Sequence, residues 1–221
     1  MPKLRVDSFT ISLDGYAVGP NQRLDAPFGD GTEGLHDWMF ATRTARAGQG
    51  LDGGEDGLDD ERVARHGEGA GATIMGRNMF GPFRGPWEDE SWKGWWGDNP
   101  PYHNDVFVLT HHERPTFHLE GGNVFHFVDA TPGAVLKEAF AAAGGKDVLL
   151  AGGAATIRQF LRAGLVDELN LVIAPILVGG GERLFEDLDD ALQRYEVTEM
   201  ISSKTVTHVR LARRADPAPD A

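Results

Sequence analysis

The chain has 221 residues, no cysteine and a formal net charge of −13 at pH 7. The lack of cysteine excludes disulfides, thiol catalysis and Cys-ligated metal sites, and the acidic balance argues against nucleic acid or an anionic membrane as the main partner. Hydrophobic residues at 41% and charged residues at 25% are ordinary for a globular protein. We expect one domain over residues 1–214 and a disordered tail over 215–221.

The N-terminal residues 1–7 alternate charged and apolar side chains, so they lack the apolar core of a signal peptide. No uncharged run reaches the length of about 18 residues that a membrane span requires. We therefore expect a cytoplasmic protein without a membrane-spanning segment.

Hydrophobic periodicity predicts eight strands and four helices, which alternate along most of the chain. The expected strands are 3–13, 72–76, 105–110, 123–129, 147–151, 168–178, 197–204 and 205–213, and the expected helices are 36–46, 58–66, 132–143 and 154–163. The last three strands follow one another without a helix. This order predicts an α/β fold of three layers, in which helices cover both faces of a mixed central sheet of about eight strands with an antiparallel C-terminal edge.

The expected strand 72–76 ends in Gly76, and Arg77 and Asn78 follow as the chain turns toward a short helix. Glycine lets backbone amides approach a phosphate, a helix start offers free N–H groups, and arginine can bind a phosphate through two parallel hydrogen bonds. The alternative is an ordinary turn with a solvated cation. The residues of this segment alone favour neither interpretation.

The expected strand 105–110 ends at Leu109 and Thr110, and His111 and His112 follow. Adjacent histidines on an extended chain point to opposite faces, and no third ligand stands at a fixed spacing, so the pattern disfavours a metal site. We favour contact with the ribose or adenine of a nucleotide.

The expected strand 147–151 leads into Gly152 and Gly153, directly before the helix that contains Ala154 and Thr156. A helix N-terminus carries partial positive charge, and two glycines leave no side chain between it and an anion. The alternative is a tight strand-to-helix turn. Three strand ends that all offer ligand groups favour a binding site, because ligands of open α/β sheets bind at the carboxyl ends of the strands.

Four of the five tryptophans lie close together in the Pro- and Gly-rich segment 81–104, at Trp87, Trp92, Trp95 and Trp96. Tryptophan is enriched in subunit interfaces and in apolar pocket walls. The sequence leaves both roles open for this segment.

Six motifs, at residues 12–16, 75–77, 109–111, 151–154, 164–169 and 175–185, resemble in chain order those of the dihydrofolate-reductase-like superfamily. Within it they are most similar to the C-terminal reductase domain of riboflavin-biosynthesis (pyrimidine) reductases. The resemblance covers nearly the whole chain. It implies the dihydrofolate-reductase-like fold and an NADPH-dependent reductase that transfers hydride to a small heterocyclic or carbonyl substrate.

The resemblance also implies roles for individual residues. Arg77 would bind the 2′-phosphate of NADPH, residues 109–111 would line the adenosine pocket, and Gly152 and Gly153, joined by a cis peptide bond, would flank the pyrophosphate and the nicotinamide. The expected cofactor-binding residues are Gly76, Arg77, Asn78, Leu109, Thr110, His111, Gly152, Gly153, Ala154 and Thr156. A homodimer is implied as well, and the apolar run 171–178 supports it unless that strand is central and buried on both faces.

Two residues depart from the family pattern. Met79 replaces a threonine that would donate a hydroxyl to phosphate, and Ala151 replaces a glutamate that riboflavin-pathway reductases carry before the glycine pair. The companion aspartate is kept as Asp14. The loss of one of two substrate-site carboxylates argues against the riboflavin-pathway substrate.

Reduction of a C=O or C=N group needs a proton besides the hydride. The candidate catalytic residues are Asp14 on the first loop and Asp37 at the start of the first helix, where His36 is a further proton donor to consider. For Asp14 the alternative is an ordinary turn carboxylate, and the resemblance favours the functional role. For Asp37 the alternative, stabilisation of a helix N-terminus, is favoured over the catalytic role. At the level of the whole chain, the alternative is a non-catalytic nucleotide-binding or interaction module on the same fold.

Overall fold

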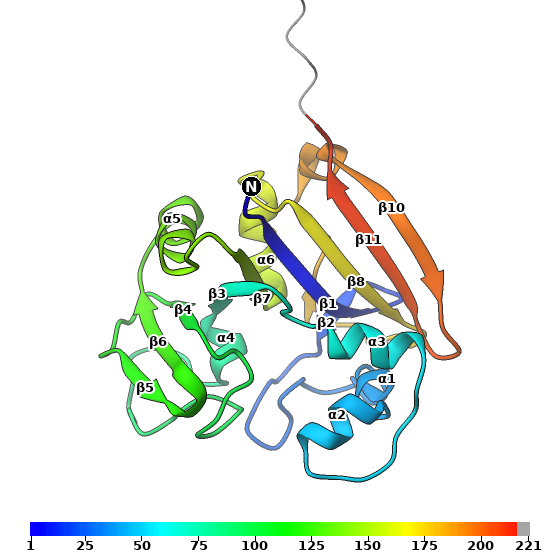
Figure 1. The fold of residues 1–221 in the computed structure, drawn as a ribbon, viewed down its shortest axis with the longest axis horizontal. Coiled ribbons are helices and arrows are strands. Elements are labelled where there is room, and N and C mark those ends of the chain that lie inside the picture. The colour runs from blue at the N-terminus through cyan, green and yellow to red at the C-terminus, as the bar shows by residue number, and fades with distance from the viewer. Residues whose placement is uncertain (216–221) are drawn as a thin grey trace, which may run out of the picture.

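The computed structural model describes residues 1–215 and consists of a large central sheet with helices around it (Figure 1). The strands are β1 (Leu4–Ser12), β2 (Tyr16–Val18), β3 (Ala70–Gly76), β4 (Asp105–Leu109), β5 (Phe117–Leu119), β6 (Asn123–Val128), β7 (Asp147–Gly152), β8 (Glu168–Ala174), β9 (Glu182–Arg183), β10 (Tyr195–Ser202) and β11 (Thr207–Arg213). The α-helices are α1 (Asp37–Phe40), α2 (Arg43–Gly48), α3 (Leu58–Ala64), α4 (Arg77–Phe80), α5 (Pro132–Ala142) and α6 (Ala154–Arg162), and two 3₁₀ turns are η1 (Glu120–Gly122) and η2 (Asp189–Arg194).

The central sheet has nine strands in the order β10-β11-β8-β1-β7-β3-β4-β6-β5, and β2 and β9 form a separate pair. The six strands from β8 to β6 in that order run parallel. At one edge β11 is antiparallel to β8, and β10 is antiparallel to β11. At the other edge β5 is antiparallel to β6. The predicted mixed sheet with an antiparallel C-terminal edge is therefore confirmed.

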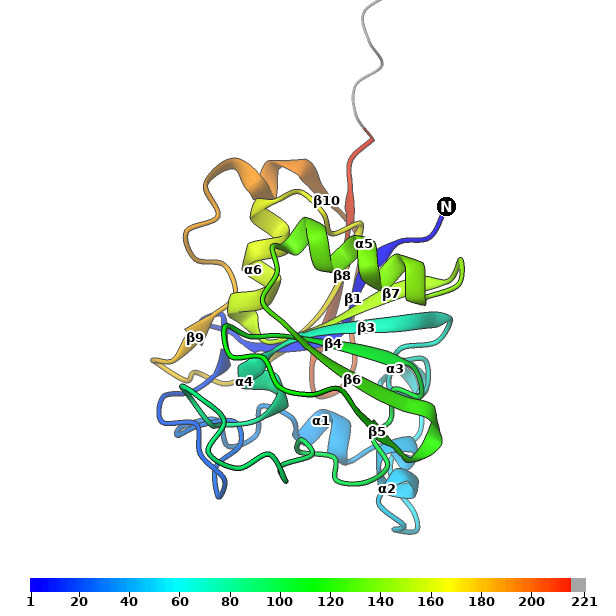
Figure 2. The same ribbon diagram turned by 90° about the vertical axis from the view of Figure 1, so that its left-hand side faces the viewer.

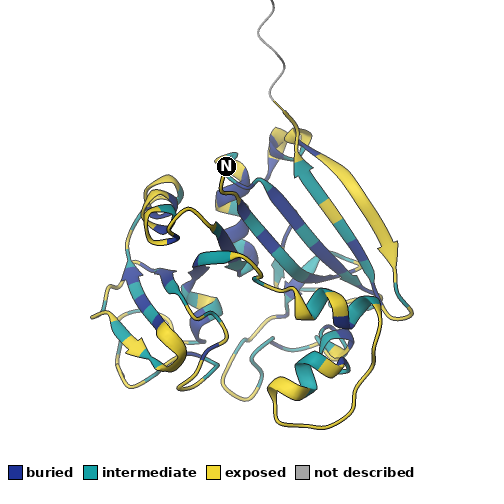
Figure 3. Ribbon diagram, viewed as in Figure 1, coloured by how far each residue is buried: buried dark blue, intermediate teal, exposed yellow. Residues whose placement is uncertain are grey.

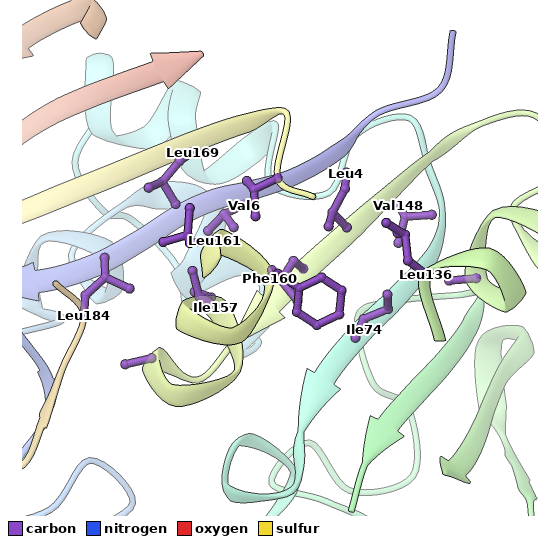
Figure 4. Close-up of a cluster of buried hydrophobic side chains, with 14 of the residues drawn as sticks. Leu4, Val6, Ile74, Leu136, Val148, Ile157, Phe160, Leu161, Leu169 and Leu184 are labelled. Atoms are coloured by element: carbon purple, nitrogen blue, oxygen red, sulfur yellow. The ribbon is translucent and has the colours of Figure 1, made fainter. Parts of the chain in front are cut away.

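Helices α5 and α6 cover one face of the sheet, and α1, α2 and α3 lie on the other (Figure 2). The main core lies under α5 and α6, where Phe160 and Ile157 pack with Leu4, Val6 and Ile74 (Figure 4). A smaller core on the opposite face joins α1 to β8. The structure thus has the expected three layers.

The expected helix 36–46 is divided into α1 and α2. Thr42 takes an extended conformation and caps α2, because its Oγ1 accepts a hydrogen bond of 3.2 Å from the Ala45 N–H. Capping threonines begin helices, so the chain changes direction where periodicity alone predicts continuation. Strands β2, β5 and β9 and helix α4 are too short for periodicity to reveal, and the three strands are additions to the expected set.

The expected strand 168–178 ends at Ala174, because Pro175 has no N–H to continue the ladder. Strand β8 lies between β1 and β11 and is largely buried, so its apolar character reflects a central position and gives no support for a dimer. Strand β10, by contrast, is exposed at the sheet edge (Figure 3). The expected tail lies outside the described residues except for Ala215. None of the described helices is long and apolar enough to cross a bilayer.

Candidate cofactor site and active site

Three of the sequence-predicted segments meet at the carboxyl edge of the sheet. Strand β3 lies between β7 and β4, and all three are parallel. In the register of the strands Gly76 is paired with Leu109, and Met75 with Gly152. The residues that follow these strand ends therefore face one shared region, as the sequence predicts.

The glycine pair at the end of β7 leaves open space at Gly153, directly before the start of α6. The peptide bond between Gly152 and Gly153 is cis, as expected from the resemblance. A Cβ on Gly152 would stand 2.8 Å from Phe9 Cε2 and 3.2 Å from Met79 Sδ, whereas a Cβ on Gly153 would meet no atom within 4 Å. No side chain caps the N-terminus of α6. The open space at Gly153 and the partial positive charge of the α6 N-terminus both suit an anionic group.

The side chain of Arg77 is held at the start of α4. Its Nη1 lies 3.4 Å from Thr110 Oγ1, and its Cζ lies 3.8 Å from the centroid of the Trp87 ring. The Nε and Nη2 atoms are buried and have no hydrogen-bond partner within residues 1–215. These two nitrogens form one edge of the guanidinium, the edge that binds a carboxylate or phosphate through two parallel hydrogen bonds.

The surroundings of Arg77 are cationic although the protein is acidic. Burial, together with Arg84 and Arg114, lowers the pKa of Arg77 from its ordinary value. In the described part of the chain, no carboxylate oxygen lies within 4.0 Å of any of these three guanidinium groups. Both features favour the binding of an anion here.

Of the other expected cofactor-binding residues near the ends of β3 and β4, only Thr110 makes a side-chain hydrogen bond to Arg77 within residues 1–215. Thr110 is buried beside the guanidinium. His111 is largely exposed, with its Nδ1 3.0 Å from Asp129 Oδ1, and Asn78 is exposed on α4. Within residues 1–215 no group of three or more His, Asp or Glu side chains is arranged to hold a metal ion.

Asp14 connects the loop after β1 to the loop after β8. Its carboxylate accepts hydrogen bonds from Ser12 Oγ at 2.6 Å, from the Val178 N–H at 3.1 Å and from the Gly179 N–H at 2.8 Å. The Ser12 hydrogen bond contributes most to lowering the pKa of Asp14 to about 2. The carboxyl group is thus ionised near neutral pH and organises two loops.

The start of α1 presents the two other candidate proton donors. Asp37 is exposed in the first turn and has no side-chain hydrogen bond or ion pair within the described residues. The ring of His36 stacks on Phe28 with centroids 4.1 Å apart. Burial lowers the pKa of His36 to about 4, so its imidazole is neutral at pH 7.

Residues 2–208 match the family model of the RibD C-terminal domain. The chain belongs to this family. Family membership agrees with the motifs at the three strand ends and with their convergence at one edge of the sheet.

Two crystal structures share this RibD C-terminal domain fold. A protein named for riboflavin biosynthesis from Shewanella sp. PV-4 is 22% identical, with a TM-score of 0.64 over 97% of this chain and 100% of the other. A pyrimidine reductase-like protein from Corynebacterium diphtheriae is 19% identical, with a TM-score of 0.54 over 97% and 93%. The uncharacterized protein YyaP of Bacillus subtilis is 39% identical over 61 residues, which span 28% of this chain and 30% of that protein.

Part of the tryptophan-rich segment of this RibD-family chain packs against the sheet. Trp92, Trp96 and Tyr102 pack with Phe80 and Phe125 on the face of the sheet opposite α5. Much of the segment is nevertheless exposed, including residues 88–91 and 97–99, so its role as pocket wall or subunit interface stays a prediction.

Sequence reasoning missed Arg84 and Arg114 in the Arg77 surroundings, and it named Trp87 only as part of the tryptophan cluster, without relating it to Arg77. Trp87, Arg84 and Arg114 come from loops on either side of β4 and carry no motif. The only signal was the concentration of aromatic and cationic residues between β3 and β5.

Proposed function

We propose that this RibD-family protein is an NADPH-dependent reductase that transfers hydride to a small heterocyclic or carbonyl substrate. The observation that carries the proposal is the unpaired edge of Arg77, Nε and Nη2, in the described part of the chain, with Arg84 and Arg114 nearby. Buried donors without partners are costly, and a phosphate would satisfy both. The family match supports reductase chemistry.

The residues at the strand ends fit a phosphate-bearing dinucleotide. In this proposal Arg77 binds the 2′-phosphate, with Gly76 and Asn78 beside it, and Leu109, Thr110 and His111 contact the adenosine. Gly152, Gly153, Ala154 and Thr156 receive the pyrophosphate and the nicotinamide, because the start of α6 is uncapped and the space at Gly153 is open. NADPH, when bound, supplies the hydride.

The two carboxylates have different roles in the proposed reaction. Asp14 positions substrate through the loops that it connects, because a carboxyl group with a pKa of about 2 is a poor proton donor at pH 7. Asp37 is the candidate proton relay, since its carboxylate is exposed and makes no competing contact within residues 1–215. Ala151 leaves the glycine pair without the neighbouring carboxylate, which favours a substrate other than the riboflavin-pathway pyrimidine.

A homodimer remains part of the proposal, with strand β10 as its contact surface. This edge strand exposes Val197, Met200 and Ile201, with exposed fractions of 59%, 71% and 42%. A long exposed edge strand with apolar side chains favours pairing with another strand. The expected cytoplasmic location stays a prediction.

The experiment that tests the function is a titration of the purified protein with NADPH, followed by a screen for NADPH oxidation. The screen includes dihydrofolate, pyrimidinone ribityl phosphates and quinones. Binding with turnover supports the reductase, and binding without turnover of any substrate favours the non-catalytic module. Absence of NADPH binding would overturn both.

A further inference from the structure

Two side chains from different loops hold the guanidinium of Arg77. The ring of Trp87 lies against it, with the ring centroid 3.8 Å from Cζ, and Thr110 Oγ1 accepts a hydrogen bond from Nη1 at 3.4 Å. An aromatic ring stacked on a guanidinium leaves the in-plane N–H groups free of the ring. The two contacts therefore fix the orientation of the guanidinium without using Nε or Nη2, which have no hydrogen-bond partner among residues 1–215.

Trp87 and Thr110 are joined to each other through the backbone of His112. The His112 carbonyl oxygen accepts hydrogen bonds from Trp87 Nε1 and from Thr110 Oγ1, the latter at 3.3 Å. The His112 N–H donates to Thr110 Oγ1 at 3.1 Å, so this hydroxyl uses its one donor and both acceptor positions. The contacts form a closed ring around Arg77, and we call Trp87, Thr110 and His112 the Arg77 frame.

The ring of Trp87 is fixed independently of Arg77. It packs edge-on against Phe80 and Phe127, with ring centroids 6.0 and 5.3 Å away. Phe80 is fully buried and is the last residue of α4, the helix that begins with Arg77. Trp87 is therefore a support for the guanidinium and not a surface ring that follows it.

The Arg77 frame acts against electrostatic repulsion. Arg84 and Arg114, together with the larger effect of burial, lower the pKa of Arg77. Like charges favour positions that are farther apart and better solvated. The cation–π attraction to Trp87 and the hydrogen bond to Thr110 oppose such a displacement of the side chain.

A guanidinium of fixed orientation binds a phosphate with more selectivity than a mobile one. Arginine has a long side chain, and one that is already held loses less conformational freedom on binding. Its paired in-plane N–H groups match a phosphate in a defined relative orientation. A mobile arginine could follow a phosphate to the adjoining carbon of a ribose, whereas a held arginine could not.

We propose that Trp87 is a positioning residue that determines specificity: it fixes the guanidinium of Arg77 and thereby favours nucleotides with a phosphate at the ribose 2′ position over their 3′ isomers. The inference rests on the proposed function for the assignment of the 2′-phosphate to Arg77. It adds that the tryptophan-rich segment contributes to cofactor selection through Arg77.

The test is calorimetric titration of the full chain with adenosine 2′,5′-bisphosphate and with adenosine 3′,5′-bisphosphate, which differ only in the position of one phosphate. Wild type should prefer the 2′,5′ isomer. Trp87→Leu should bind that isomer about 2- to 30-fold more weakly, the range that a lost cation–π contact implies. Its affinity for the 3′,5′ isomer should change less, so the preference falls. Trp95→Leu is the matched control and should keep the preference, since Trp95 packs edge-on against Trp92 in the same segment.

Two further variants separate positioning from packing. Trp87→Phe keeps an aromatic ring but lacks the donor to His112 and has a weaker cation–π interaction, so its preference should lie between those of wild type and Trp87→Leu. Thr110→Val removes the hydroxyl that binds Nη1 and should lower the preference with Trp87 still in place. An unchanged preference in Trp87→Leu, or an equal loss of affinity for both isomers in the two Trp87 variants, would show that Trp87 serves packing alone and overturn the inference.

The failure of this inference differs from failure of the proposed function. If wild type prefers the 2′,5′ isomer and the Trp87 variants keep that preference, only the role of Trp87 is wrong. If wild type binds neither bisphosphate nor NADPH, the cofactor assignment is wrong and this inference falls with it.

Discussion

Thr156 lies so close to Gly76 that a Cβ on Gly76 would stand 2.1 Å from Thr156 Oγ1. Gly76 has φ −83°, a conformation open to any residue, so glycine is needed here for space alone. The contact joins the end of β3, directly before Arg77, to the first turn of α6. The phosphate arginine and the helix N-terminus are thereby fixed relative to each other.

Gly76→Ala should lower the free energy of unfolding by about 1–3 kcal/mol, because the added methyl overpacks this contact. Urea unfolding measures the change. Adding Thr156→Ala should restore part of it, since the clashing oxygen is removed while Thr156 Cβ, 3.3 Å from where the methyl would stand, remains. Gly133→Ala is the control, because a Cβ at Gly133 meets no atom within 4 Å. Strictly additive effects of the two substitutions would contradict the contact.

Arg77→Ala should weaken NADPH binding by about 10- to 100-fold, equivalent to about 1.5–3 kcal/mol for a lost charge-assisted hydrogen bond. NADH binding should change little, because NADH lacks the 2′-phosphate. Fluorescence titration with both cofactors measures the two affinities. Arg84→Ala, which removes a nearby exposed charge, should cost less. Equal losses of affinity for NADPH and NADH would show that Arg77 does not bind the 2′-phosphate.

Asp14→Asn should raise KM or lower turnover while NADPH affinity stays nearly constant, since the amide cannot accept hydrogen bonds from both Val178 and Gly179 in the same way. With a pKa of about 2, Asp14 should produce no step in the rate between pH 5 and 9. Because its folded pKa is lowered, its stabilising effect is present above about pH 4 and is lost toward pH 2. Steady-state kinetics against pH provide the measurement.

Asp37→Asn is the matched control for Asp14. If Asp37 relays the proton, its replacement should reduce kcat while NADPH affinity stays nearly constant. Loss of turnover in Asp14→Asn, together with a fall in the wild-type rate above neutral pH that vanishes in this variant, would instead make Asp14 the proton donor.

His36 should make stability depend on pH. Its pKa is lowered from 6.5 to about 4, so the unfolded chain binds more protons in that interval and stability falls as the pH drops from about 6.5 to 4. The loss is at most about 3 kcal/mol. His36→Phe keeps the stacking on Phe28 and should flatten this part of the curve in thermal unfolding. His111→Phe, at an exposed ring, should leave it unchanged.

Met200→Lys should convert the proposed homodimer to a monomer, because it places a charge in the exposed apolar edge of β10. Light scattering should give about twice 24.0 kDa for wild type and about 24.0 kDa for the variant. Leu51→Lys, at an exposed leucine away from β10, should keep the wild-type mass. A wild-type mass near 24.0 kDa at micromolar concentration would refute the dimer.

The parallel core of this fold follows from local sequence patterns, whereas the contact between Trp87 and Arg77 does not. Each of β3, β4 and β7 is a short apolar run that ends in a glycine or is followed by a polar residue, so both the strands and the shared edge could be predicted. Trp87 contacts Arg77 only because the segment between β3 and β4 folds back over the strand ends. Tertiary packing decides that contact, and no residue spacing encodes it.

Local sequence patterns predict one of the two threonine-capped helix starts and miss the other. Thr131 directly precedes a proline, a pattern that predicts the cap of α5, and its Oγ1 does accept a hydrogen bond from the Ala134 N–H. Thr42 caps α2 in the same manner, but it lies inside a continuous apolar pattern that predicts one helix. Periodicity cannot distinguish a bend between two short helices from a single longer one.

The position of β1 in the sheet determines when the chain can complete its fold. Leu4 pairs with Val148, and Arg5 with Glu168, so β1 leaves the ribosome long before either of the strands that flank it. During synthesis its apolar side chains stay exposed until β7 and β8 have emerged. Contacts so distant in sequence slow folding and prolong exposure to aggregation. A fragment that stops before Asp147 would leave β1 without a neighbour on either side.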